Sequence, residues 1–195
     1  DAVITAADIA GTNAFGVIPP FADQPALAEG TARFRGEAVA LVVGDADWLA
    51  GADVSGFPVT WQAREAAIEI TAARASGAAQ LHAGRDGNLL VTGRVVSGEG
   101  ADGLAGAAAT VSATVDTAYV EHAPIEPEAG CAWMEGDVLV VSACTQAPVM
   151  DQEDTAKILG LPREKVRIIP ATAGGGFGTK LDVSLQPPAD VLEHG

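Results

Sequence analysis

The chain has 195 residues, of which 48% are apolar and 19% charged, and its net charge is −15 at pH 7. This length and composition allow a real core, shared between two modest domains. The 11 Lys and Arg residues are scattered, which argues against nucleic-acid or anionic-membrane binding, because both need clustered basic side chains. No secretory leader opens the sequence and no apolar run approaches the roughly 18 residues of a membrane span, so we expect a cytoplasmic protein.

Cysteine and histidine are too rare here for a metal centre built from side chains. Cys131 and Cys144 are the only cysteines, too few for a disulfide framework or a four-thiolate iron–sulfur centre, and we expect two buried free thiols. His82, His122 and His194 have no ligand spacing with these cysteines. No protein-ligated metal is predicted, so a metal has to arrive with its own cofactor.

The first 58 residues predict short strands joined by loops. Residues 38–43 are apolar on both faces, which predicts a buried central strand. Residues 45–58 contain Gly51, Gly56 and Pro58 and are predicted to form helix poorly. The chain begins inside a strand without an initiator Met, which indicates a fragment. The remaining expectations are a strand at 2–5, a helical turn at 6–9, a loop at 15–25 and a strand at 31–34.

In the middle of the chain, a stretch with strand and helix patterns is followed by a Gly-rich stretch. We expect a strand at 59–62 and a helix at 65–75. Residues 76–106 are rich in Gly, Ala and polar residues, with a strand only at 89–92, and a domain linker is placed at about 85–105. Apolar and small polar residues then alternate along 108–120, which predicts a half-buried strand.

A dense polar cluster follows at residues 121–128. Glu121, His122, Glu126 and Glu128 lie within eight residues, a composition suited to general acid–base chemistry. Two prolines make the segment an irregular loop, and carboxylates grouped near a strand end are more often solvated or bonded to backbone. We therefore assign no catalytic role to these residues.

The last third predicts a strand, helix and strand unit. A hairpin is expected between 132–134 and 138–142, and it leads to Gln146, whose amide offers one acceptor and two donors. A helix is expected over 151–159, with acidic residues in its first turn and Gly160 after its end. A strand over 164–170 then runs into a glycine-rich loop, so Gln146 and this loop should meet at one sheet edge.

Residues 173–180 read Ala-Gly-Gly-Gly-Phe-Gly-Thr-Lys, with four glycines in five positions. Such a backbone turns sharply and leaves N–H groups uncovered, which form a nest for anionic groups. The spacing fits neither the Walker loop nor the dinucleotide pattern. An ordinary Gly-rich turn is the alternative, and the preceding strand favours a ligand loop.

Residues 174–180 resemble the molybdopterin-contacting loop of the molybdenum hydroxylases, the xanthine dehydrogenase and aldehyde oxidoreductase family, in the large subunit. Residues 121–128 resemble the family's Glu-His-x-x-x-Glu-Pro-Glu segment, and residues 144–148 its Thr-Gln element. The earlier stretches 8–13, 23–28 and 33–43 resemble its α/β-hammerhead domain. These segments follow the family's order over most of the chain.

The resemblance implies an α+β fold and an internal fragment of the large subunit. Residues 1–95 would be the hammerhead domain, and residues 96–195 the first part of a molybdopterin-binding domain with mixed sheets. The likeness ends after Gln186, where residues 187–195 depart from the family.

The resemblance also implies a chemistry. The family hydroxylates aldehydes or N-heterocycles with oxygen from water, at molybdenum held by the dithiolene of a molybdopterin, here expected in a dinucleotide form. Backbone donors at Gly175, Gly176, Phe177 and Gly178 and the side chain of Gln146 would contact the cofactor. The family's catalytic glutamate lies further along the large subunit, so no catalytic residue is expected here and the chain alone should be inactive.

Substrate and partners follow from the same resemblance. Purine-oxidising relatives carry Glu where this chain has Leu181, which favours aldehydes over purines, although the neighbouring Asp182 leaves purines open. The expected partners are the rest of the large subunit and the iron–sulfur and flavin (FAD) domains or subunits that take the electrons. Two other classes stay open: an acidic binding or scaffold module that kept the fold without the chemistry, and a glycine-loop nucleotide binder.

Overall fold

The computed structural model describes residues 2–98 and 100–183, which form a mixed α and β structure with two small sheets. The chain divides into two compact units, one made of Asp1–Val59 and His122–Gly195 and the other of Thr60–Glu121. Residues 187–195, expected to depart from the family pattern, lie outside the described residues.

The larger sheet has three strands in the order β3 (Gly130–Glu135), β4 (Val138–Ala143) and β5 (Val166–Pro170). Strands β3 and β4 are antiparallel, and β4 and β5 are parallel. The turn between β3 and β4 uses Gly136, whose φ of 68° suits glycine. The hairpin and the strand before the glycine loop are thus confirmed.

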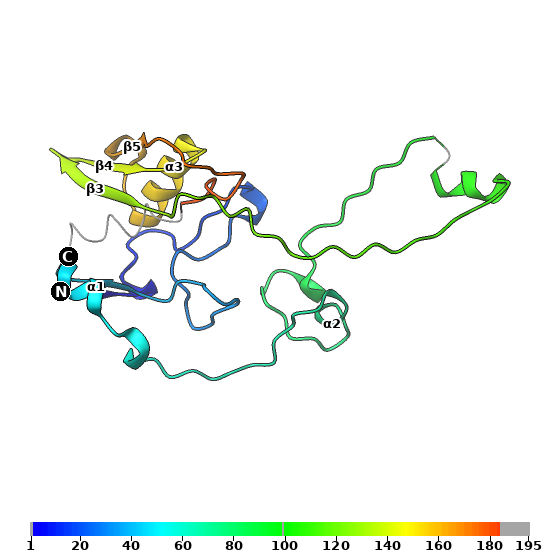
Figure 1. Cartoon of the computed structure of the whole chain (residues 1–195), viewed down its shortest axis with the longest axis horizontal. Helices are drawn as coiled ribbons and strands as arrows, with labels where there is room; N and C mark the ends of the chain where they lie inside the picture. Colours follow the sequence, from blue (N-terminus) through cyan, green and yellow to red (C-terminus); the bar gives the residue numbers. More distant parts are fainter. Residues whose placement is uncertain (1, 99, 184–195) are drawn as a thin grey trace. The chain divides into compact units, whose positions relative to one another are not determined.

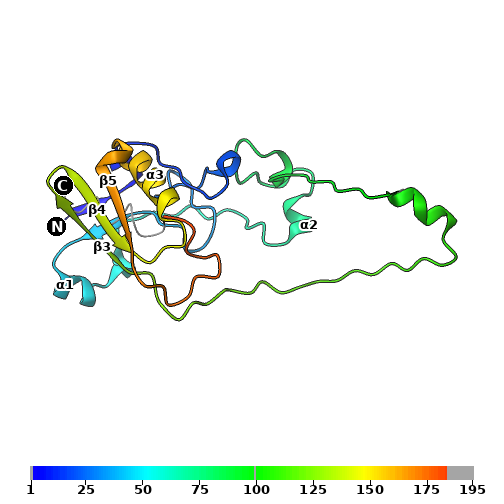
Figure 2. The ribbon, with the colours of Figure 1, turned by 90° about the horizontal axis from the view of Figure 1, so that it is seen from above.

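Helix α3 (Pro148–Leu159) connects β4 to β5 and packs on one face of this sheet (Figures 1 and 2). It begins with a proline in its first turn and is followed by Gly160 in the left-handed conformation, both ordinary helix boundary signals. It confirms the helix predicted at 151–159 and starts three residues earlier. The buried core between helix and sheet consists of Leu139, Val141, Ala143, Ala156 and Val166.

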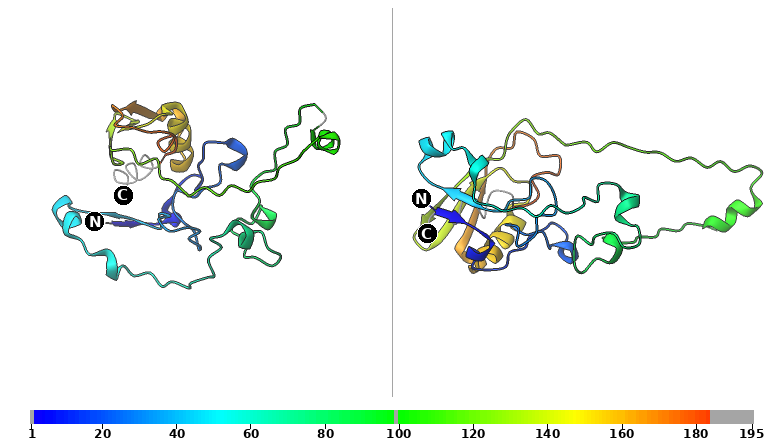
Figure 3. Two further views of the ribbon diagram at one scale, coloured as in Figure 1. Left: turned by 45° about the vertical axis from the view of Figure 1, so that its right-hand side comes forward. Right: turned by 90° about the horizontal axis from the view of Figure 1, so that it is seen from below.

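The N-terminal part of the first unit forms a two-stranded sheet and contacts the C-terminal end of α3. Strand β1 (Ala2–Ile4) pairs antiparallel with β2 (Leu41–Val43), as Figure 3 shows. The N–H groups of Gly11 and Thr12 donate to the carbonyls of Ile158 and Lys157 at 2.9 Å each. These bonds satisfy carbonyls that the helix end leaves without partners.

Three expectations for the first 58 residues were wrong. Residues 38–43 do not form a buried central strand, since only Leu41–Val43 is extended, half-buried and in a two-stranded sheet. A helix, α1 (Ala46–Gly51), forms where poor helix propensity was expected. The Asp45 side chain accepts from the N–H groups of Asp47 at 3.0 Å and Trp48 at 3.1 Å, and this N-cap outweighs the low propensity. Residues 31–34 form no strand.

The second unit holds little regular structure. Its helix α2 (Ile70–Ala73) is one turn of the helix predicted over 65–75, and the strands expected at 59–62, 89–92 and 108–120 are absent from the described residues (Figure 1). None of its described side chains is buried. An alternating pattern yields a strand only where another strand pairs with it. Across both units, the 3-10 turns within the described residues are Ala6–Asp8, Pro19–Phe21, Val54–Gly56, Asp86–Asn88, Gly100–Gly106 and Arg163–Lys165.

No helix within residues 2–98 and 100–183 combines the length and the apolar character needed to cross a membrane.

Candidate cofactor-binding site

The site lies at the edge of the larger sheet where the parallel strands β4 and β5 both end. Gln146 follows β4 and the glycine-rich loop follows β5. The Gln146 N–H donates to the Lys180 carbonyl at 2.8 Å, and its Oε1 accepts from the Gly178 N–H at 3.0 Å. The structure therefore brings the predicted glutamine and the predicted loop together.

The loop adopts a conformation that explains its glycines. Gly175 and Gly178 have φ values of 112° and 98°, and Phe177 has a φ of 51° that is uncommon for a bulky residue. The N–H and the hydroxyl of Thr179 donate to the Gly176 carbonyl at 2.9 and 2.6 Å, which closes the turn. The Phe177 ring stays 70% exposed.

Two of the glycines also lie very close to neighbouring side chains. A Cβ placed on Gly174 would come within 2.6 Å of Glu126 Cβ, and one placed on Gly176 within 2.5 Å of Gln146 Oε1. At Gly174 the near atom is the Cβ of Glu126, which cannot turn away, so glycine is required there. At Gly176 a larger residue would have to displace the flexible Gln146 side chain.

Three consecutive backbone donors of the loop are unused. Among the hydrogen bonds of the described residues, none is donated by the N–H of Gly175, Gly176 or Phe177, nor by the side-chain NH₂ of Gln146. The neighbouring N–H groups of Gly174 and Gly178 do have partners. Uncovered amides of this kind suit an anionic or oxo ligand.

Beside the loop lies a charged cluster of Glu126, Cys144 and Lys180. The Lys180 ammonium donates to Glu126 Oε2 at 2.7 Å and to Cys144 Sγ at 3.4 Å. Hydrogen bonds with the Cys144 thiol, the Lys180 ammonium and the Gly174 N–H lower the pKa of Glu126 to about 2. The bond to Glu126, together with burial, raises the pKa of the Cys144 thiol.

The 121–128 segment lies against the glycine loop. A Cβ on Gly175 would lie 3.2 Å from Pro124 Cβ, and one on Gly178 would lie 4.0 Å from His122 Nε2. With its lowered pKa, Glu126 is a very weak base near neutral pH and does not suit general base catalysis. The structure thus favours a supporting role for Glu126.

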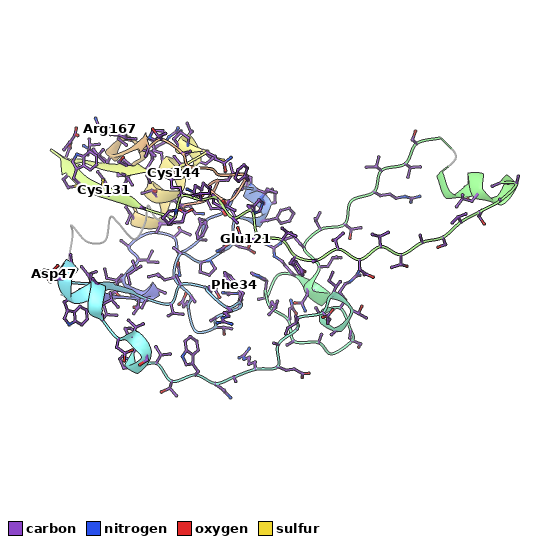
Figure 4. All side chains as sticks on the ribbon, in the orientation of Figure 1. Phe34, Asp47, Glu121, Cys131, Cys144 and Arg167 are labelled. Atoms are coloured by element: carbon purple, nitrogen blue, oxygen red, sulfur yellow. The ribbon has the colours of Figure 1, made fainter. Side chains whose placement is uncertain are left out.

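The two thiols differ from the expectation of two buried cysteines. Both are free, and Cys144 is buried, but Cys131 on the edge strand β3 is exposed (Figure 4). Among the strands that the structure describes, β3 is at the edge of its sheet, so residues there are covered on fewer sides than those of β4. Within the described residues no group of three or more His, Cys, Asp or Glu side chains could hold a metal ion.

Sequence reasoning missed the role of Lys180, the burial of Asp151 and the partial burial of Asp154 and Asp182. Lys180 is 1% exposed, and its partner Glu126 lies 54 residues away, so no local pattern announces the pair. Asp151 in the first turn of α3 is fully buried, and burial raises the pKa values of Asp151, Asp154 and Asp182. Acidic residues in the first turn of α3 were expected only because they interact favourably with the helix dipole, and that reason does not predict their burial.

The buried Asp151 predicts a pH-dependent stability. Burial raises its pKa from 3.8 to about 6, so the folded state keeps a proton that the unfolded chain releases. Its contribution favours folding at low pH and is lost as the pH rises through about 6. The quantity to compare is the unfolding free energy of the Asp151→Asn variant minus that of the wild type. This difference should be about 2 kcal/mol larger at pH 7.5 than at pH 4.

Urea unfolding of both proteins at the two pH values measures this difference. Comparing the two proteins isolates Asp151 from its neighbours Asp154 and Asp182, which titrate in both. A gap between variant and wild type that stays constant from pH 4 to pH 7.5 would contradict the assignment.

Comparison with known proteins decides the family. Residues 81–192 match the model of the molybdopterin cofactor-binding domain. The chain belongs to this family. The matched range contains the glycine loop and Gln146, and it includes the cluster of Glu126, Cys144 and Lys180.

Individual relatives agree with the family assignment. The chain is 32% identical over 192 residues to a probable xanthine dehydrogenase subunit of Bacillus subtilis, covering 98% of this chain and 25% of that protein. It is 32% identical over 195 residues to the nicotinate dehydrogenase large molybdopterin subunit of Eubacterium barkeri, covering 100% of this chain and 45% of that protein. It is 40% identical over 75 residues to the aldehyde oxidoreductase molybdenum-binding subunit PaoC of Escherichia coli, covering 38% of this chain and 10% of that protein. The chain thus spans less than half the length of these relatives.

Proposed function

We propose that this molybdopterin-binding family member holds its cofactor at the glycine loop and Gln146. The observation that carries the proposal is the run of three unused N–H groups at Gly175, Gly176 and Phe177 beside the unused NH₂ of Gln146. These groups fit the anionic pterin and its metal because every free donor is neutral and preorganised by the fold.

Each donor has a separate part in this proposal. The N–H groups of Gly175, Gly176 and Phe177 bind oxygen or sulfur atoms of the cofactor, and the Gln146 NH₂ orients it from the other strand end. The Gly178 N–H, also expected to contact the cofactor, donates to Gln146 Oε1 here and so fixes the rotamer of that glutamine.

The proposed activity is hydroxylation of an aldehyde or an N-heterocycle by a molybdenum-dependent oxidoreductase. The molybdenum, held by the pterin dithiolene, supplies the oxygen transfer and takes up the electron pair. The relatives are named as xanthine, nicotinate and aldehyde enzymes. The side chain of Leu181, which follows the loop, is apolar and cannot hydrogen-bond a purine. We therefore favour aldehydes over purines as substrates.

We further propose the organisation of the whole enzyme. Residues 1–95 form an α/β-hammerhead domain and residues 96–195 the start of the molybdopterin-binding domain, with a dinucleotide form of the cofactor. The catalytic base lies elsewhere in the large subunit, so this chain alone is inactive. Iron–sulfur and flavin domains or subunits take the electrons, and the enzyme works in the cytoplasm.

Isotope labelling of the native protein, purified with its associated subunits, tests this activity. Aromatic aldehydes and hypoxanthine are each supplied with an artificial electron acceptor in water enriched in ¹⁸O. We expect carboxylic acid that carries one ¹⁸O beyond the exchangeable aldehyde oxygen, and slower or absent purine turnover. Protein from molybdate-free culture serves as the matched control and should be inactive. Equal turnover by that control, or product oxygen drawn from dioxygen, would refute the proposal.

A further inference from the structure

The ammonium of Lys180 is enclosed by acceptors from two other segments of the chain. Its residue is 1% exposed, and it donates to Glu126 Oε2 at 2.7 Å, to the Glu126 carbonyl at 3.3 Å and to Cys144 Sγ at 3.4 Å. An ammonium has three donors, so all of them are used. A buried cation of this kind is tolerated only when it is paired and hydrogen-bonded.

Glu126 ties the same cluster to the beginning of the glycine loop. Its Oε2 accepts from the Gly174 N–H at 2.8 Å, and its own N–H donates to the Gly174 carbonyl at 3.5 Å. One carboxylate therefore bonds the first glycine of the loop and the lysine that ends it.

The loop is fixed on its other side by Gln146. The backbone N–H of Gln146 donates to the Lys180 carbonyl and its side chain accepts from Gly178. Every one of these contacts lies outside the run Gly175 to Phe177, whose N–H groups stay uncovered. The bonds hold the two ends of the loop and leave its middle open.

We propose that Glu126 and Lys180 are positioning residues, whose ion pair, buried on the lysine side, fixes the glycine loop so that its three free N–H groups point at the cofactor. The inference rests on the proposed function, because it assigns the pair to cofactor binding rather than to general stability. The pair acts through the loop and touches no reacting atom.

The protonation states keep this arrangement constant. The pKa of Glu126 lies near 2 and that of Lys180 is raised above its usual value by the same pair. Both groups therefore stay charged across the working pH range, so the pair acts as a fixed support and not as a switch. The neutral Cys144 thiol fills the remaining position beside the ammonium.

Lys180→Met and Glu126→Gln in the native protein test the pair. Lys180→Met leaves a carboxylate without its cation, whereas Glu126→Gln keeps an oxygen for the Gly174 N–H and a near-identical shape. Arg167→Met is the matched control, because the Arg167–Glu135 pair also joins distant residues but is about half exposed on each side. The double variant Glu126→Gln/Lys180→Met removes both charges.

Two readouts separate positioning from simple stability. Hydrogen exchange of the Gly174 and Gly178 amides in cofactor-free protein should speed up at least tenfold in Lys180→Met, less in Glu126→Gln, and partly recover in the double variant. Molybdenum and pterin per subunit in cofactor-loaded protein should fall at least fivefold in Lys180→Met, while exchange in β4 and α3 stays at the wild-type rate. Arg167→Met should change neither readout.

Some results would overturn the inference. Unchanged exchange at Gly174 and Gly178 in both single variants would show that the pair does not hold the loop. Faster exchange with full molybdenum and pterin content would show that loop order does not serve the cofactor. If the wild type itself carries no molybdopterin, the proposed function fails, and the exchange rates still decide whether the pair orders the loop.

Discussion

Replacing Gly11 with alanine is expected to lower the free energy of unfolding by about 3 kcal/mol, the largest effect on stability predicted for this chain. The new Cβ would lie 2.0 Å from the Lys157 carbonyl oxygen, 2.5 Å from the Gly160 nitrogen and 2.7 Å from the Ile158 carbonyl oxygen. All three are backbone atoms at the end of α3, so no side chain can turn away to make room. The 10–12 segment has to move off the helix, and the carbonyls that it caps lose their partners.

Urea unfolding followed by circular dichroism measures this effect on the whole 195-residue chain. Gly51→Ala is the matched control, since nothing lies within 4 Å of a Cβ at this position in α1. The control should match the wild type or gain a few tenths of a kcal/mol from better helix propensity. A Gly11 variant as stable as the Gly51 variant would mean that the N-terminal segment does not rest on α3.

Replacing Gly176 with alanine is expected to remove most of the bound cofactor and leave the fold intact. The added Cβ would lie 2.5 Å from Gln146 Oε1 and 2.7 Å from Gln146 Cδ. Because these atoms belong to the end of a flexible side chain, Gln146 moves instead of the backbone and gives up its bond to Gly178. Its NH₂ then leaves the position beside the free loop amides. We expect molybdenum and pterin per subunit to drop at least tenfold, which corresponds to about 1.4 kcal/mol of binding free energy.

The coupling between Gly176 and Gln146 can be measured directly. Gln146→Ala removes the side chain that the new methyl group displaces, so adding Gly176→Ala to it should cost much less than in the wild-type background. The unfolding free energy of the Gly176 variant should stay within about 1 kcal/mol of the wild type. Full cofactor content in Gly176→Ala, or strictly additive losses in the double variant, would contradict the role given to this glutamine.

The C-terminal third of the chain was predictable because its signals are local. The hairpin follows from two apolar runs across a Gly-containing turn, and α3 from an acidic first turn and Gly160. The meeting of Gln146 with the glycine loop follows from topology, since both come after parallel strands of one sheet.

The other features of the structure depend on single side chains or on contacts between residues far apart in the sequence, which sequence patterns do not indicate. The Asp45 cap that stabilises α1 rests on one side chain, which a propensity average over residues 45–58 does not register. Apolar residues at 108–120 alternate as in a strand, yet no partner strand pairs with them within the described residues. The pair of Lys180 and Glu126 joins residues 54 positions apart. Asp151 is buried by tertiary packing, which no repeating pattern in the sequence indicates. The division into domains near residue 95 stays a prediction.

The most direct test of the central claim is metal and pterin analysis of the native protein that contains this chain, grown with ample molybdate. Elemental mass spectrometry counts molybdenum, and fluorescence of the oxidised pterin counts the cofactor. We expect molybdenum and pterin in equal amounts, close to one of each per large subunit. Protein that carries neither under these conditions would contradict cofactor binding at the glycine loop and would favour an acidic scaffold module with the same fold.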